Sequence, residues 1–429
     1  MKILLLAPQP FYTERGTPIA VRLAATVLVR AGHQVDLLCY HEGEDVALEG
    51  LAVHRIRPPA FVRNVPIGFS WKKLVCDLWL GAAAWERIRN GQYDVVHAVE
   101  ESVFLALAAR RWSRFALVYD MDSLMSAQLV EKKPVLRIFE PLLRSIERAA
   151  VRHSDRVLAV CPAIETFARE AGAGGRVHLL PDVPFPLPAG VLPEERVTPT
   201  AADENLRALF PQAGALVLYV GNLERYQGVD LLLDALAQGD AKTACNLVVV
   251  GGTPADAGRY RERVRTLGLD DHVRIVGARP LAQLPSLLAQ ADILCSPRLV
   301  GTNTPMKIYS YLAAGRAVLA TAIESHTQVL DRRCALLVAP SAKALGAALV
   351  RLAGDPALRT ALANHARRRA HEHFGFERFE QRLVAAYRGL GSLAGITPAR
   401  GVPPAARPAF RAGDTSGESP AAPAARSDT

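Results

Sequence analysis

A lysine that follows a Thr-Pro pair is the clearest candidate for chemistry in this sequence. Thr304 and Pro305 are typical of a helix start, because threonine can cap a helix and proline at its first position loses only an N–H that has no partner. Lys307 would then lie in the first turn, beside free backbone N–H groups and the positive end of the helix dipole. Such a position suits a phosphate. The alternative is an ordinary strand–helix unit whose lysine is merely solvated.

The residues around this lysine predict a strand, a loop, a helix and a second strand. Residues 292–295 and 318–320 are short apolar runs of the kind found in buried strands. Residues 306–314 predict a helix that ends at Gly315. This order places a helix N-terminus at the carboxyl end of a parallel strand, where open α/β sheets bind ligands. Ser310 shares a helix face with the lysine.

Two further predicted strands end in polar residues. Residues 94–98 (DVVHA) carry His97 near their end, and residues 116–119 lead directly into Asp120 and Asp122. Polar side chains at these ends face the crevice of an open α/β sheet. His97 could instead be a hydrogen-bonded structural histidine. The D-x-D pair matches a known metal motif, but three-residue matches are common by chance, and both carboxylates could equally orient a substrate hydroxyl.

The chain opens with a strand, a loop and a helix. Residues 2–7 predict the strand, and Gly16 in the loop would let the backbone approach a ligand. Thr17-Pro18 is a second helix start, and the helix over 19–31 ends at a glycine. This opening is Rossmann-like. Because it lacks G-x-G-x-x-G, it does not indicate a dinucleotide site.

Composition narrows the class of protein. The 429 residues suffice for two domains, and with 50% hydrophobic residues they can bury large cores. No apolar run has the length of a membrane span, and the N-terminal one is too short for a signal peptide. Six scattered cysteines without C-x-x-C predict reduced, packed thiols in a cytoplasmic protein. The net charge of +9 suits an anionic ligand or membrane surface, and no nucleic-acid-binding motif is present.

Two segments could contact a membrane. Residues 69–89 form an amphipathic pattern in which Trp71 and Trp79 lie near Lys72 and Lys73, as in helices at a membrane interface. Aromatic stripes at helical spacing are also typical of a buried core, which is the alternative. The second segment, 131–156, is basic, and a solvated face is its default interpretation. If the first segment does not bind the membrane, this one is the next candidate.

Changes in composition predict the domain organisation. We expect a first domain over 1–190, a linker over 191–214, a second domain over 215–375, a helix over 376–393 that packs back, and a disordered tail over 394–429. Both domains show the strand–helix alternation of α/β proteins. The predicted fold class is therefore α/β, with two Rossmann-like domains facing across a cleft.

At this point the chain resembles the GT-B type glycosyltransferases of group 1 (family 4), over nearly its whole length except the tail. The matching segments, in the family's order, are the loop with Gly16 and residues 94–98, 147–160, 219–237, 247–252, 273–280 and 304–321. The resemblance implies a UDP- or GDP-sugar donor held by the second domain. It also implies a glycan, lipid-linked or small-molecule acceptor held by the first, with retention of configuration and without metal or cofactor. Work at the inner membrane surface would follow from a lipid-linked acceptor.

The sequence departs from the family in three places. Members commonly carry two glutamates eight residues apart, near the donor sugar and on the ribose, where this chain has Thr302 and Ser310. A basic pair that usually meets the diphosphate is replaced by Asn222 and Gln227. The family's crevice histidine is Val99.

The resemblance implies the following site. The predicted donor-binding residues are Gly16, Gly221, Asn222, Arg225, Gln227, Thr302, Asn303, Thr304, Lys307 and Ser310. Lys307 and Arg225 would meet the diphosphate, and Ser310 would contact the ribose weakly. His97 and Asp122 are the acceptor-side candidates for catalysis, with Lys307 as the third catalytic residue. Two alternatives remain: a weakly active or inactive binding protein of the same fold, and a sugar-nucleotide epimerase or a phosphorylase of that shape.

Overall fold

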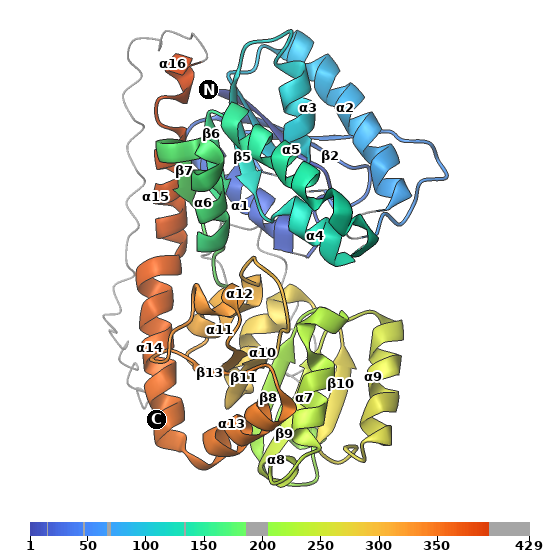
Figure 1. The fold of residues 1–429 in the computed structure, drawn as a ribbon, viewed down its shortest axis with the longest axis vertical. Coiled ribbons are helices and arrows are strands. Elements are labelled where there is room, and N and C mark those ends of the chain that lie inside the picture. The colour runs from blue at the N-terminus through green and yellow to red at the C-terminus, as the bar shows by residue number, and fades with distance from the viewer. Residues whose placement is uncertain (15, 46–47, 67–69, 133, 186–204, 394–429) are drawn as a thin grey trace, which may run out of the picture. The chain divides into compact units, whose positions relative to one another are not determined.

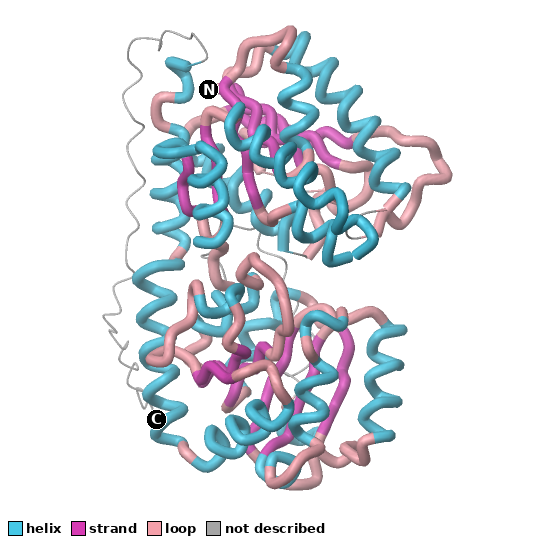
Figure 2. The backbone as a smooth tube through the Cα atoms, viewed as in Figure 1, coloured by secondary structure: helices cyan, strands magenta, loops and turns pink. Residues whose placement is uncertain are grey.

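Two parallel β-sheets form the framework of the molecule (Figures 1 and 2). The computed structural model describes residues 1–14, 16–45, 48–66, 70–132, 134–185 and 205–393. The first sheet has the order β3-β2-β1-β4-β5-β6-β7. Its strands are β1 Lys2–Ala7, β2 Gln34–Cys39, β3 Leu51–Arg55, β4 Val95–Val99, β5 Ala116–Met121, β6 Arg156–Ala159 and β7 Val177–Leu179. All its neighbouring strands pair in parallel, so their carboxyl ends lie at one edge.

The second sheet repeats this plan with the order β10-β9-β8-β11-β12-β13. Its strands are β8 Ala215–Val220, β9 Cys245–Val250, β10 Val273–Gly277, β11 Ile293–Ser296, β12 Ala317–Thr321 and β13 Leu336–Val338. They are again parallel throughout. The central strands of both sheets are fully buried and mostly apolar, as expected where helices cover both faces.

Helices cover the first sheet on both faces. One core joins it to α2 Trp71–Gly91, α3 Ser102–Ala109, α5 Glu140–His153 and α6 Pro162–Ala168. Beside α5 lie α4 Met125–Lys132 and a 3₁₀ helix, Pro134–Phe139. The core on the other face contains α1 Gly16–Arg30 and the C-terminal α15 Phe376–Tyr387. Consecutive residues of β1 from Ile3 to Ala7 alternate between these two cores, which is why the strand is apolar at each of these positions.

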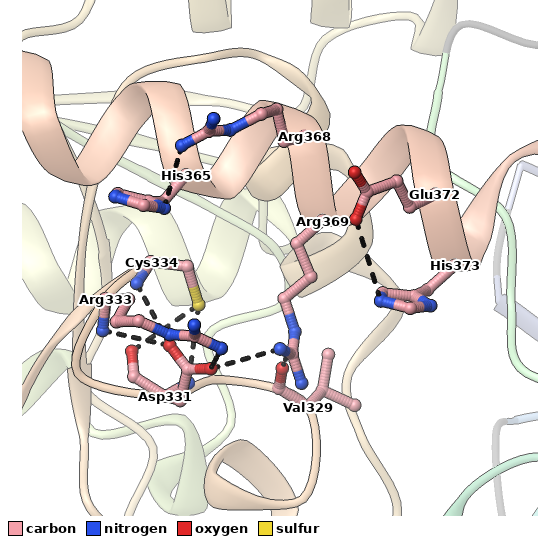
Figure 3. Close-up of polar contacts among 9 residues, drawn as sticks. All are labelled: Val329, Asp331, Arg333, Cys334, His365, Arg368, Arg369, Glu372 and His373. Atoms are coloured by element: carbon pink, nitrogen blue, oxygen red, sulfur yellow. Dashed lines mark hydrogen bonds and ion pairs between the residues drawn. The ribbon is translucent and has the colours of Figure 1, made fainter.

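The second sheet is covered in the same way. Its helices are α7 Val229–Leu236, α8 Ala241–Ala244, α9 Pro254–Thr266, α10 Leu284–Gln290, α11 Met306–Ala313, α12 Glu324–Thr327, α13 Ala342–Gly354 and α14 Pro356–Phe374, and α16 Leu390–Leu393 follows α15. Polar contacts fix α14 to the loop after α12 (Figure 3). Arg369 donates from Nε to the carbonyl of Val329 at 2.7 Å, and its Nη1 lies 3.1 Å from Oδ2 of Asp331.

The structure corrects several predicted elements. Pro305 precedes α11 in an extended conformation, so it occupies the cap position, and Thr304 does not cap the helix. The basic segment 131–156 contains the end of α4, a 3₁₀ helix and α5. The elements that were not predicted include β3, α3, α4, α8, α12 and β13. β3 and β13 are the short outer strands of their sheets and are only partly buried, so they lack a clear apolar run.

Parts of the predicted organisation lie outside the described residues. The predicted tail 394–429 is one such part, and the predicted linker is described only from residue 205. All six cysteines are free and buried, as the sequence predicted. Among the described residues, no helix combines the length and apolar character that a membrane span needs.

Candidate active site

The side chain of Lys307 lies at the carboxyl end of the second sheet. Its Nζ donates to Oε1 of Gln227 at 3.1 Å and lies 4.0 Å from the ring centroid of Tyr219, at the end of β8. Among the described residues, no carboxylate forms an ion pair with it. Burial, and then the nearby guanidinium of Arg298, lower the pKa of Lys307 from 10.5 to about 7. The fold therefore holds a cation whose charge would be stabilised by an incoming anion.

A glycine makes room for this ammonium group. Gly221 follows β8 with φ of 147°, and a Cβ there would lie 2.7 Å from Nζ of Lys307 and 3.2 Å from the hydroxyl of Tyr219. The loop after it carries Asn222, whose carbonyl accepts from the Tyr219 hydroxyl at 2.6 Å, and the exposed Arg225. The structure thus brings Gly221, Gln227 and Lys307 together, with Asn222 and Arg225 on the adjoining loop.

The loop between β11 and α11 is folded around Arg298, which the sequence reasoning missed. Arg298 is buried and donates to the carbonyl of Val300 at 2.7 Å and to both oxygens of Asn303 at 3.1 and 3.2 Å. Asn303 thereby holds the loop, and its predicted role toward a donor stays a prediction. No side-chain pattern in the sequence marked this arginine, because its partners are mainly backbone carbonyls of the loop.

Gln328 connects this loop to the first half of the chain. Its Nε2 donates to the carbonyl of Thr302 at 2.9 Å and to the hydroxyl of Thr304 at 2.8 Å. Its Oε1 accepts from the backbone N–H of Ala163, at the start of α6, at 3.0 Å. Thr302 and Thr304 are therefore positioned by an amide side chain from the helix after β12. No motif in the sequence indicated this residue.

A buried histidine is hydrogen-bonded to the ends of β11 and β12, beside the loop between β11 and α11. His326 contacts the Ser296 hydroxyl at 2.9 Å through Nε2 and the Thr321 carbonyl at 2.8 Å through Nδ1. The Thr321 hydroxyl in turn donates to the carbonyl of Arg298. Burial lowers the pKa of His326 to about 4, so the ring is neutral at physiological pH. These contacts were also missed, because single Ser, Thr and His residues at strand ends carry no pattern.

Ser310 lies on the same helix as the lysine but is used by the protein itself. It is 2% exposed, and its hydroxyl accepts from the backbone N–H of Phe185 at 3.0 Å. A ribose contact at Ser310 stays a prediction, and it would require the residues around Phe185 to give way.

His97 is fully buried and bonded at both ring nitrogens. Nδ1 lies 2.6 Å from the hydroxyl of Tyr387 in α15, and Nε2 lies 3.0 Å from Oδ2 of Asp120 in β5. With the side chain 0% exposed, this geometry supports the structural alternative that the sequence left open. The histidine joins the C-terminal helix to the first sheet, and a catalytic role for it stays a prediction that this geometry does not support.

Replacing Tyr387 with phenylalanine is expected to lower the free energy of unfolding by about 1–3 kcal/mol, because it leaves a buried ring nitrogen of His97 without a partner. Tyr119→Phe is the matched control: Tyr119 is also buried, and its hydroxyl has no hydrogen-bond partner among the described residues. Denaturant unfolding measures both. Equal effects of the two substitutions would contradict the role assigned to the His97–Tyr387 bond.

Asp122 belongs to a group of partly buried carboxylates at the carboxyl edge of the first sheet. The pKa of Asp122 is raised well above its ordinary value, first by burial and then by the nearby carboxylates of Asp120, Glu100 and Asp182. A hydrogen bond with Thr17 opposes this rise. The pKa of Glu100 and that of Asp182 are each raised to about 7, mainly by burial. Gly16 begins α1, one residue before Thr17, and has open space where a Cβ would lie. Asp122 and Gly16 thus lie in the same region.

The raised pKa of Asp182 predicts how stability changes with pH. Its carboxyl titrates near 7 in the folded state and near its ordinary value of about 4 when unfolded. Between these two values the unfolded state binds fewer protons than the folded state. Ionisation of Asp182 therefore lowers the stability of the fold progressively from about pH 4 to pH 7. Asp182→Asn should therefore raise the midpoint of thermal unfolding by about 2 °C or more at pH 8, and by little at pH 4. The exposed Asp240→Asn is the control, and a shift that does not depend on pH would contradict the burial argument.

Among the described residues, no three His, Cys, Asp or Glu side chains are grouped as a metal site would require.

Comparison with known proteins identifies the class. Solved structures with the same two-sheet arrangement include sucrose-phosphate synthase from Thermosynechococcus elongatus, with a TM-score of 0.73 at 22% identity over 91% of this chain and 99% of that one. Anabaena HepE in complex with UDP-glucose gives a TM-score of 0.64 at 16% identity over 90% of this chain and 98% of that one. The predicted α/β class with two Rossmann-like sheets, the GT-B fold, is confirmed.

Sequence comparison identifies the family. A model described as Glycosyltransferase Family 4 matches residues 15–182, and one described as Glycosyl transferases group 1 matches residues 214–355. The phosphatidyl-myo-inositol mannosyltransferase of Mycolicibacterium smegmatis is 25% identical over 388 residues, which cover 87% of this chain and 90% of the relative. The D-inositol 3-phosphate glycosyltransferase of Salinispora arenicola is 28% identical over 407 residues, covering 87% and 86%. The chain belongs to the group 1 (family 4) glycosyltransferases.

Proposed function

We propose that this protein is a retaining hexosyltransferase that moves a sugar from a nucleoside-diphosphate sugar to a lipid-linked acceptor. The observation that carries the proposal is the uncompensated ammonium of Lys307 at the start of α11. A diphosphate placed there would meet this charge together with the free N–H groups of the helix N-terminus. Family membership supports the sugar-transfer chemistry.

The proposed role of the site is to stabilise the leaving group. Breaking the bond between sugar and diphosphate puts negative charge on the departing phosphate oxygen, so a cation held there favours the transition state over the ground state. Lys307 would carry this role, and Arg225 on the adjoining exposed loop would supply a second charge. The backbone at Gly221 and Gly16 would approach the donor. In this proposal the diphosphate charge is met by protein cations, without a metal.

The donor and the acceptor are proposed from the relatives. Anabaena HepE was solved with UDP-glucose, which supports a UDP-sugar, and a GDP-sugar remains the alternative. The names of the mannosyltransferase and of the inositol-phosphate glycosyltransferase support an acceptor that carries an inositol phosphate. A lipid acceptor would place the protein on the cytoplasmic surface of a membrane. Asp122 and the neighbouring carboxylates would face acceptor hydroxyls.

A second candidate is a binding protein of the same fold with little activity. It is favoured by Thr302 and Ser310, which stand where family members commonly carry carboxylates, and by the engagement of both residues in internal hydrogen bonds. An epimerase acting on sugar nucleotides is the third candidate.

A two-stage assay separates these candidates. Nucleoside diphosphates are first screened by thermal shift, because a bound ligand raises the unfolding temperature by mass action. The matching sugar nucleotides are then incubated with the protein and with vesicles that contain phosphatidylinositol. We expect a glycolipid product with the donor's anomeric configuration. Binding without turnover would indicate the binding protein, a free epimerised sugar nucleotide would indicate the epimerase, and either result would overturn the proposal.

A further inference from the structure

A row of large apolar side chains is exposed along the 3₁₀ helix Pro134–Phe139 and along α5. Its members are 44–77% exposed: Val135, Ile138, Phe139, Leu142 and Ile146. Leu142 and Ile146 are one helical turn apart, so the row continues along one side of α5. Single exposed apolar residues are ordinary, whereas a continuous row marks an interaction surface.

Arginines run beside this row. Arg144, Arg148 and Arg152 recur at every fourth residue of α5, and Arg137 extends the series into the 3₁₀ helix. An open hollow of about 490 Å³ lies here, lined by Arg137, Glu140, Pro141, Arg144 and Arg148. Its one carboxylate, Glu140, is 3.0 Å from Arg144. The hollow is therefore predominantly basic.

The remaining carboxylate of α5 does not weaken this basic surface. Glu147 is buried and accepts from the backbone N–H of Met125 at 2.8 Å and from the hydroxyl of Ser126 at 2.6 Å, both in α4. Its carboxylate therefore lies on the buried side of the helix. The exposed side of α5 thus combines an apolar row with a basic row, which is the pattern of helices that lie in a membrane interface.

The segment that the sequence favoured for membrane contact differs in its charges. Trp71, Leu74 and Leu78 of α2 are exposed, so they are not buried in the core. However, Lys73 pairs with Glu101, and the ammonium of Lys72 donates to a backbone carbonyl. The two lysines beside the apolar residues of α2 are therefore engaged, whereas α5 carries three exposed arginines on one side, beside its apolar row. Charge complementarity to an anionic surface favours α5.

We propose that the face formed by the 3₁₀ helix Pro134–Phe139 and α5 docks on an anionic lipid bilayer, with its apolar row in the interface and its arginines on lipid phosphates. α2 lies on the same side of the first sheet as α5, with α3 between them (Figure 1). This inference rests on the proposed function in one respect: membrane docking would bring the enzyme to its lipid acceptor. Neither Lys307 nor any other residue assigned to the donor belongs to this face.

Flotation with vesicles of 70% phosphatidylcholine and 30% phosphatidylglycerol tests the proposal without donor or acceptor. Each arginine near an anionic surface contributes about 1 kcal/mol. The double variant Arg144→Ala, Arg148→Ala should therefore bind about 30-fold more weakly, which corresponds to about 2 kcal/mol. Leu142→Ser with Ile146→Ser should also weaken binding, since it removes the apolar row. Because these side chains are exposed, all four substitutions should leave the thermal unfolding temperature unchanged.

The matched control is the pair Leu74→Ser and Leu78→Ser in α2, which should bind within about threefold of the wild type because the arginines remain. Three results would overturn the proposal. They are no binding by the wild-type protein at low salt, equal binding to vesicles of pure phosphatidylcholine, and loss of binding in the α2 pair but not in the α5 pairs. Turnover on a soluble acceptor should be unchanged in the α5 variants, so failure of this proposal and failure of the transferase proposal give different results.

Discussion

Replacing Lys307 with alanine is expected to lower turnover by about 100-fold or more. The ammonium group is already positioned and largely desolvated, so it needs no reorganisation when charge develops on the leaving diphosphate. Removing one such preorganised group at a developing anion costs on the order of 100- to 1,000-fold in other enzymes. Steady-state kinetics with the donor found by the binding screen measures the effect.

The fold should survive this substitution. Burial of an uncompensated charge is unfavourable, so Lys307→Met is expected to unfold at the same or a higher temperature than the wild type. Lys343→Ala, on the exposed side of α13, is the control for loss of a positive charge. Unchanged turnover in a folded Lys307→Ala protein would remove the lysine from the site.

Replacing Gly221 with alanine is expected to lower turnover by between about 10- and 100-fold. The new Cβ would lie 2.7 Å from Nζ of Lys307, so the ammonium group has to move away from its place beside Tyr219 and Gln227. Misplacement of a catalytic group by about 1 Å can cost a factor of about 100. The φ of 147° at this position adds backbone strain, since side chains rarely adopt it.

A second glycine separates strain from displacement. Gly239 also has a positive φ, 61°, but a Cβ there would meet nothing within 4 Å. Gly239→Ala should therefore reduce stability without changing turnover. If Gly221→Ala has full activity in the folded state, or if Gly239→Ala loses as much, the close approach of Gly221 to Lys307 does not matter for the reaction.

Elements with long periodic or apolar patterns were predictable from the sequence. The strand Lys2–Ala7 begins and ends at the predicted residues, and the strand–helix–strand order around Lys307 is present with shifts of one residue. These elements are buried against a whole face of a sheet, and such burial requires apolar residues at regular spacing in the sequence. β3 lies at the edge of its sheet and is only partly buried, so its sequence shows no clear apolar pattern.

The site was less predictable, because its geometry depends on residues distant in the sequence. The sequence could mark Lys307 as a first-turn cation, but not that Gln227 and Tyr219 would be its neighbours. The sequence left open whether His97 faces a crevice. In the structure His97 is buried, and its partner is the hydroxyl of Tyr387, which is 290 residues away in the sequence. The roles of Arg298 and Gln328 come from hydrogen bonds to backbone carbonyls, which no side-chain pattern records.

Proton uptake on binding tests the central claim most directly. A lysine with a pKa of about 7 is mostly neutral at pH 8, and an adjacent diphosphate would favour its charged form. Calorimetric titration of UDP and GDP at pH 8, in two buffers of different ionisation enthalpy, should show uptake of about one proton per nucleotide bound by the wild type. Lys307→Met should show none. Absence of uptake in the wild type, or the same uptake in both proteins, would contradict the assignment of Lys307 to the diphosphate.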